Sequence, residues 1–278
     1  MNLAHYLEAS AINFPQKAAV RHEGDVITYQ ELNDQCNRFA AGLQKRGLAA
    51  QDRCVLMMPN SIQVIIAYFA LAKLGAVTVP VNFLYRRHEL MHIMTDSKPK
   101  GFIGAAPYLD EVCPVLAQTD TTSIRVAAGN PDHAGFIDYD SIYMSEAAFS
   151  SYPATPDDTL NILYTSGTTG RSKGVMLTHG NLASETRILT DMRGKLDAGA
   201  VVVGVLPLYH VYGITSVLNV SFYQGLTVEL LTHFDPAVVI DIVEKEKQTI
   251  LFAVPTMYNR LFQVAGENPP QHSSVDFC

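Results

Sequence analysis

Hydrophobic and polar residues along this chain follow two periods, one typical of helices and one of buried strands. Thr28 and Glu31 match the capping box that begins a helix, and Gly47 fits its end. The apolar positions between them recur at helical spacing: Leu32, Cys36, Phe39, Ala40 and Leu43. The apolar run RCVLMMP that follows, residues 53–59, predicts a buried strand.

The same order of strand and helix recurs further along the chain. Asn60 is a candidate cap for a second helix, which turns Ile62, Ile65, Ile66 and Phe69 inward and ends before Gly75. Further helices are predicted over RRHELMHIMTD (86–96) and AVVIDIVEKEK (237–247), the latter started by Asp235 and Pro236. Further strands are predicted over AVTVPV (76–81), GFIGA (101–105), AVVVGVLPL (200–208) and TILFAVP (249–255). This alternation with short links predicts an α/β protein with a parallel-rich sheet covered by helices.

The middle of the chain shows neither the helical nor the strand-like period of hydrophobic residues. Residues 127–140 and 145–158 are rich in turn formers and acids, and we expect loops or a linker there. A chain of 278 residues fits one large domain or two smaller ones. We therefore predict a first α/β subdomain over 1–150, a linker over 151–160, and the start of a second subdomain over 161–278.

Composition narrows the class of protein. The net charge of −7, without a basic run, argues against a nucleic-acid partner. The start of the chain lacks the pattern of a signal peptide, and the apolar stretch 62–81 is interrupted by Gln63, Lys73, Gly75 and Pro80. The four cysteines are scattered, as expected for reduced thiols. These features predict a cytoplasmic protein with at most a peripheral membrane association.

One metal-like pattern occurs at residues 88–92, which spell H-E-x-x-H. On a helix this pattern can place two histidines on one zinc ion. However, the apolar face of the helix is defined by Leu90, Ile93 and Met94, so we expect His88 and His92 to face solvent. No third ligand stands out in the sequence, and we predict no metal site.

The stretch TSGTTGRSKG, residues 165–174, is the strongest candidate for a binding loop. It carries three glycines, five hydroxyls and two cations between the strand-like segments NILY and VMLTH. Glycines let backbone N–H groups converge on phosphate oxygens, and hydroxyls and a lysine add donors. The alternative is an exposed hairpin tip. The stretch satisfies neither the Walker A pattern nor G-x-G-x-x-G, which argues against a P-loop GTPase or a dehydrogenase.

Together with its neighbours, this stretch carries a specific resemblance. The relevant segments are YTSGTTGRSKGVMLTH (164–179), ITYQELN (27–33), ALAKLGAVTVPVNFLY (70–85), PLYHVYG (207–213) and VPTMYNRLF (254–262). In order and spacing they resemble the motifs of the adenylate-forming (AMP-binding) superfamily, most closely those of medium- and long-chain fatty-acid acyl-CoA synthetases. The resemblance implies layered parallel-rich sheets covered by helices, forming part of the large N-terminal domain of such an enzyme.

The resemblance also implies a two-step ligase reaction. A carboxylic acid attacks the α-phosphorus of Mg-ATP to form an acyl-adenylate and pyrophosphate, and the thiol of coenzyme A then displaces AMP. The residues implied for the β- and γ-phosphates are Thr165, Ser166, Gly167, Thr168, Thr169, Gly170 and Lys173. His210 is implied beside the acyl carboxylate as the catalytic residue. The residues implied near the acyl tunnel are Tyr209, Val211, Tyr212 and Gly213, for which core packing is the alternative.

The family pattern extends beyond this chain. The adenine and ribose contacts, the acidic residue that helps to hold Mg²⁺, and the C-terminal lid domain with its lysine are expected past Cys278. We therefore expect an incomplete fragment of the enzyme whose isolated chain is not fully active, and whose exposed apolar surface favours a homodimer. Two alternatives stay open, namely adenylation of an aromatic or amino acid for a carrier protein and a non-catalytic nucleotide-binding fragment. Asp235 is a candidate contact for a substrate amine, although a helix N-cap is the alternative.

Overall fold

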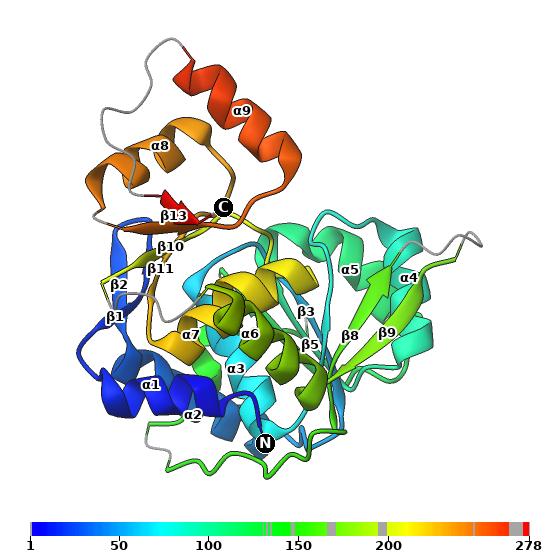
Figure 1. Cartoon of the computed structure of the whole chain (residues 1–278). Coiled ribbons are helices and arrows are strands. Elements are labelled where there is room, and N and C mark those ends of the chain that lie inside the picture. Colours follow the sequence, from blue (N-terminus) through cyan, green and yellow to red (C-terminus); the bar gives the residue numbers. More distant parts are fainter. Residues whose placement is uncertain are drawn as a thin grey trace. The chain divides into compact units, whose positions relative to one another are not determined.

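The structure is a computed structural model of the chain (Figure 1). It describes residues 2–129, 131, 133, 135–145, 148–165, 171–193, 199–246, 248–266 and 275–277. The chain divides into two compact units. The first unit comprises Met1–His5, Asn33–Pro59 and Gln63–Ala183. The second comprises Tyr6–Leu32, Asn60–Ile62 and Ser184–Cys278.

The first unit is built on a seven-stranded sheet with the order β7-β6-β5-β3-β4-β8-β9. Its strands are β3 (Arg53–Met57), β4 (Val77–Pro80), β5 (Gly101–Ala105), β6 (Ile124–Ala128), β7 (Ile137–Asp138), β8 (Thr159–Thr165) and β9 (Lys173–Thr178). All neighbouring pairs are parallel except β8 and β9, which form an antiparallel hairpin. Parallel pairing places the carboxyl ends of β3 to β8 at one edge of the sheet, and the loop between β8 and β9 leaves from that edge.

The direction of the crossovers decides which face each helix covers. The helices of this unit are most of α2 (Tyr29–Lys45), α3 (Ile62–Leu74), α4 (Arg87–Ser97) and α5 (Leu109–Leu116), with the short 3₁₀ helices Ala106–Tyr108 and Tyr139–Ile142. The crossover through α3 runs from β3 to β4, whereas those through α4 and α5 run in the opposite direction along the sheet. Because such crossovers are right-handed, α4 and α5 share one face and α3 covers the other (Figure 1). The core agrees, since α4 and α5 bury their apolar residues against Val55, Met57 and Val79.

The second unit has a six-stranded sheet with the order β13-β12-β10-β11-β1-β2. Its strands are β1 (Ala18–His22), β2 (Asp25–Thr28), β10 (Val201–Gly204), β11 (Thr227–Leu230), β12 (Thr249–Leu251) and β13 (Val275–Phe277). Its helices are α1 (His5–Asn13), α7 (Val220–Gln224), α8 (Pro236–Lys245) and α9 (Pro255–Ala265), and a π-helical segment, Gly213–Asn219, leads into α7. The core of this unit holds Val203, Val239 and Leu251, and residues of α8 and α9 pack against it.

The local predictions agree with the structure where they rest on caps and periodicity. The backbone N–H of Thr28 donates to Glu31 Oε2 at 2.9 Å and that of Glu31 donates to Thr28 Oγ1 at 3.2 Å, so the capping box that starts α2 is confirmed. All five predicted inward residues of α2 are fully buried. Asp235 Oδ1 accepts from the backbone of Ala237 at 2.9 Å, which confirms the N-cap alternative for this carboxylate.

Two predictions of organisation differ from the structure. The two units do not divide at residues 151–160, because β8 pairs with β4 of the first sheet while β1 pairs with β11 of the second. The segment 127–140, expected to be a loop, contributes the end of β6 and the two-residue strand β7 to the first sheet. Both differences come from strand pairing between segments that are distant in sequence.

Candidate functional site

The predicted phosphate loop closes the antiparallel hairpin of β8 and β9. In this hairpin Tyr164 lies opposite Gly174 and Thr165 lies opposite Lys173. Opposite residues of an antiparallel pair project from the same face of the sheet, so the side chains of Thr165 and Lys173 are neighbours. Both side chains are exposed. The other predicted loop residues, Ser166, Gly167, Thr168, Thr169 and Gly170, lie outside the residues that the structure describes.

Lys173 supplies a positive charge at the base of this loop. Its ammonium forms no ion pair with any residue of the described ranges. An exposed, unpaired ammonium beside a hydroxyl is suited to an anionic group such as a phosphate.

Gly174 is required by the packing of the hairpin. A Cβ atom at this position would lie 2.8 Å from Ile162 Cγ2 and 3.2 Å from Tyr164 Cζ. The aromatic ring of Tyr164 therefore occupies the space that a side chain on the opposite strand would need. The glycine that ends the TSGTTGRSKG stretch is thus explained by the packing of this ring.

Helix α4 contacts the hairpin near the end of β8 and directly before β9. The hydroxyl of Tyr164 donates to Asp96 Oδ2 at 2.6 Å, and His92 Nε2 lies 2.7 Å from the carbonyl oxygen of Ser172. Burial and the nearby Asp96 carboxylate raise the pKa of Tyr164. The expectation that both histidines of H-E-x-x-H face solvent is correct for His88, whose side chain is 84% exposed, and wrong for His92, which is partly buried. The sequence pattern missed this contact because Ser172 is 80 residues away from His92.

Helix α6 (His179–Arg193) begins directly after β9. Thr178 and Asn181 form reciprocal hydrogen bonds between side chain and backbone at 3.0 and 3.1 Å, which cap the start of this helix. His179 is buried, and its Nδ1 accepts a hydrogen bond from the backbone N–H of Leu3 at 3.0 Å. Burial lowers the pKa of His179 to about 4, so the imidazole is neutral near pH 7. These contacts give His179 a structural role at the start of α6.

The PLYHVYG segment belongs to the second unit and connects β10 to the π-helical segment. Its backbone is organised by Asn60, whose amide nitrogen donates to the carbonyl oxygens of Leu206 at 3.0 Å and Leu231 at 3.1 Å. The side-chain oxygen of Asn60 accepts from the backbone N–H of Leu208 at 2.9 Å. The sequence suggested only a helix cap for Asn60, because these partners follow it by 146 or more residues.

Within this segment, the residues predicted to lie near the carboxylic acid substrate differ in exposure. His210, Val211 and Tyr212 are exposed, whereas Gly213 is buried. The ring of His210 lies beside that of Tyr209, with centroids 4.7 Å apart, and the partial burial of this ring lowers the pKa of His210. A neutral imidazole on an exposed turn can hydrogen-bond a ligand.

Tyr212 and Gly213 have contacts within the fold that explain these residues without a ligand. Tyr212 packs edge-on against Phe252 with centroids 6.3 Å apart. A Cβ at position 213 would lie 2.3 Å from the carbonyl oxygen of Pro207, so this turn requires glycine. Core packing, the alternative for these residues, therefore accounts for Gly213 and for part of the Tyr212 ring.

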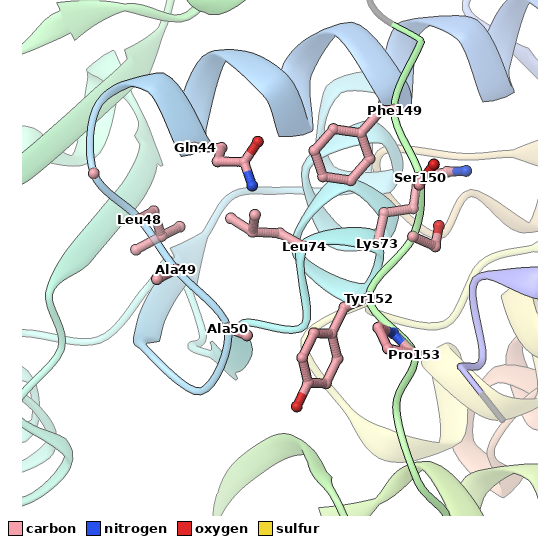
Figure 2. A pocket seen from close by; sticks show the side chains of 12 residues that line it. Gln44, Leu48, Ala49, Ala50, Lys73, Leu74, Phe149, Ser150, Tyr152 and Pro153 are labelled. Atoms are coloured by element: carbon pink, nitrogen blue, oxygen red, sulfur yellow. The ribbon is translucent and has the colours of Figure 1, made fainter.

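A separate pocket of about 490 Å³ lies in the first unit (Figure 2). Figure 2 shows Gln44, Leu74 and Tyr152 among the side chains that surround it. The lining segments precede β3, β4 and β8, so the pocket lies at the amino edge of the sheet. The hairpin loop leaves from the carboxyl edge, and none of the predicted site residues that the structure describes lines this pocket.

Among the described residues, no three histidine, cysteine, aspartate or glutamate side chains are grouped so that they could hold a metal ion. Of the helices in the described part of the chain, none combines the length and apolar character that crossing a membrane requires.

The fold and the hairpin together define an α/β protein of parallel-rich sheets with a glycine-rich loop at a carboxyl edge. The family model described as "AMP-binding enzyme" matches residues 7–277. The chain therefore belongs to the AMP-binding enzyme family.

Similar proteins include several CoA ligases. The chain is 36% identical to a feruloyl-CoA synthase from Amycolatopsis sp., over 89% of this chain and 47% of that protein. It is 31% identical to a long-chain-fatty-acid–CoA ligase from Bacillus subtilis, over 99% of this chain and 54% of that protein. The ATP-bound crystal structure of MatB from Rhodopseudomonas palustris is similar, with a TM-score of 0.82 and 32% identity over 94% of this chain and 51% of that one. The chain thus spans about half the length of the curated relatives it matches.

Proposed function

We propose that this chain supplies the ATP-phosphate loop and part of the acid-binding segment of an acyl-CoA ligase. The observation that carries the proposal is the hairpin in which exposed Lys173 lies opposite Thr165, in a member of the AMP-binding enzyme family. The ATP-bound state of the similar MatB structure supports ATP as the nucleotide.

The reaction has two steps in this proposal. A carboxylate oxygen of the acid attacks the α-phosphorus of ATP, and the bond to the β-phosphate oxygen breaks to release pyrophosphate. The sulfur of coenzyme A then attacks the acyl carbon, the bond to the AMP oxygen breaks, and the thiol proton is lost to solvent. Catalysis of the first step depends on positioning and on stabilising phosphate charge.

The residues of this chain have distinct roles in that scheme. Thr165, Lys173 and the loop Ser166–Gly170 hold the β- and γ-phosphates, so their donors act on the pyrophosphate that leaves. Neutral His210 borders the acid carboxylate and donates a hydrogen bond to it. Tyr209, Val211, Tyr212 and Gly213 lie near the acyl group.

Magnesium is expected to accompany ATP and to offset phosphate charge. The described residues contain no group of acidic side chains that fits a metal ion, so we assign no magnesium ligand among them.

The acid is proposed to be a medium- or long-chain fatty acid, as for the similar Bacillus subtilis ligase. A phenylpropenoic acid is the second candidate, because a feruloyl-CoA synthase is also among the similar proteins. These two classes differ in shape and polarity beyond the carboxylate, along the acyl group near which Tyr209 and Tyr212 are proposed to lie.

Acid-dependent exchange of radiolabelled pyrophosphate into ATP tests the proposal. The chain, and the same chain within its full-length coding sequence, would be assayed with dodecanoate, ferulate and no acid. We expect exchange with dodecanoate in the full-length protein and much weaker exchange in the isolated chain. Exchange with ferulate alone would replace the fatty-acid proposal by the aromatic one, and the absence of both ATP binding and exchange in both proteins would refute the ligase proposal.

A further inference from the structure

One side of helix α4 contacts the chain on both sides of the predicted phosphate loop. His92 and Asp96 are four residues apart and therefore lie one turn apart on the same face of the helix. His92 contacts Ser172, the last residue before β9, and Asp96 contacts Tyr164, the next-to-last residue of β8. The helix thus reaches both ends of the predicted phosphate loop.

Helix α4 is itself firmly fixed in the first unit. Its opposite face buries Leu90, Ile93 and Met94 in the core against the parallel strands. Its first turn is closed by Glu89, whose carboxylate accepts from the backbone N–H of Arg86 at 2.9 Å. Groups attached to the exposed face of such a helix are held by the core beneath it.

The two contacts also support each other. The rings of His92 and Tyr164 meet edge-to-face, with centroids 6.0 Å apart and planes at 84°. The carbonyl oxygen of Ser172 can only accept a hydrogen bond, so His92 Nε2 must carry the hydrogen. This contact fixes the peptide group between Ser172 and Lys173. The side chain of Lys173 carries the ammonium that is the candidate phosphate ligand.

We propose that His92 and Asp96 are positioning residues that hold the ends of the loop and thereby orient Lys173 toward the phosphates of ATP. This inference rests on the proposed function of the loop. Fixing the ends in advance reduces the conformational entropy that phosphate binding would otherwise have to remove. Neither residue touches the nucleotide in this proposal, so both act through the backbone of the hairpin.

Trypsin cleavage after Arg171 measures this anchoring directly. Arg171 is exposed and adjoins Ser172, so cleavage there should follow the fraction of chains in which the hairpin end has opened. The variants are His92→Phe, which keeps an aromatic ring but loses the donor, and His92→Gln, which retains an N–H donor. His88→Phe is the matched control, because His88 is on the same helix and exposed.

We expect about fivefold faster appearance of the fragment ending at Arg171 in His92→Phe, as the loss of one hydrogen bond predicts. His92→Gln and His88→Phe should stay within about twofold of the wild-type chain. If His92→Phe fails to fold, as judged by circular dichroism, Asp96→Ala and Asp96→Asn are used in place of His92→Phe and His92→Gln. Alanine removes the acceptor of the Tyr164 hydroxyl, whereas asparagine keeps one. Wild-type cleavage rates in the donor-free or acceptor-free variants would overturn the anchoring.

Adding pyrophosphate or Mg-ATP separates anchoring from function. We expect either ligand to protect the wild-type chain, and His92→Phe to need about fivefold more of it for half-maximal protection. If the two proteins need the same ligand concentration for half-maximal protection, the positioning role is overturned, even if their cleavage rates without ligand differ. No protection of the wild-type chain by either ligand would instead overturn the proposed phosphate function of the loop, while a cleavage difference between the variants would still establish the anchoring contacts.

Discussion

The buried histidine that begins α6 predicts a specific dependence of stability on pH. His179 is 2% exposed, and its Nδ1 accepts the backbone N–H of Leu3. Protonation of Nδ1 would remove this acceptor and bury a charge. Burial lowers its pKa from 6.5 to about 4, an effect to which His5 adds and which Asp158 opposes.

The sign and size of the effect follow from linkage. The pKa of His179 is lower in the folded than in the unfolded state, so between pH 6.5 and 4 the unfolded state binds more protons. The contribution of His179 to the free energy of unfolding is fully present above pH 6.5 and is lost as the pH falls toward 4. Below pH 4 this contribution no longer changes with pH. A shift of roughly 2.5 units corresponds to about 3 kcal/mol of unfolding free energy, with a slope of up to about 1.4 kcal/mol per pH unit.

Urea unfolding at pH values from 7.5 to about 4 would measure this slope. His179→Asn keeps a side-chain oxygen that can accept from Leu3 but does not titrate, so we expect the wild-type chain to lose about 3 kcal/mol more than this variant over that range. His88→Asn, at an exposed position on α4, controls for the loss of a histidine. If the wild-type chain and His179→Asn have parallel pH profiles, the proposed protonation of a buried acceptor is refuted.

Two further predictions concern the hairpin and the PLYHVYG segment. Gly174→Ala should lower the free energy of unfolding by about 1–3 kcal/mol, because its Cβ would collide with Ile162 and the ring of Tyr164; urea unfolding measures this, and a loss below about 0.5 kcal/mol would contradict the packing argument. Asn60→Ala should cost about 3 kcal/mol, because it leaves the Leu208 N–H and two carbonyl oxygens without their partner; hydrogen exchange should show a faster Leu208 amide, and an unchanged rate would contradict the assigned role.

Much of the secondary structure was predictable because its causes are local. Thr28, Glu31 and Gly47 delimit one helix within a short stretch of sequence, and Asp235 with Pro236 begins another. The strand-like segments on either side of the TSGTTGRSKG stretch are indeed strands. Caps, turns and periodicity depend on neighbouring residues, which a single sequence contains.

The arrangement of the strands was not predictable in the same way. Nothing local to β1 indicates that Val20 pairs with Val228, or that β8 adds to the sheet of β3 and β4. The expected boundary at 151–160 therefore followed a change in composition rather than a change of sheet. Pairing partners are chosen by the burial of whole faces, which depends on segments far apart in the chain.

The candidate site shows the same division. The candidate phosphate loop was predicted from its residue types and from the family resemblance, and the structure shows that Thr165 and Lys173, at its ends, are cross-strand partners. The residues that support them were missed, because His92, Asp96 and Asn60 act on backbone or hydroxyl groups at least 68 residues away. His92 in particular was assigned to solvent from the helical pattern of α4 alone.

Binding of Mg-ATP and of pyrophosphate to Lys173→Ala, measured by isothermal titration calorimetry, tests the central claim most directly. One cation–anion contact at about 4 Å contributes up to about 4 kcal/mol before desolvation costs, so a loss of about tenfold or more in affinity is expected. Arg171→Ala removes the same charge two residues away and should stay within about twofold of the wild-type chain. Equal affinities of Lys173→Ala and the wild-type chain would contradict the assignment of this hairpin to the phosphates of ATP.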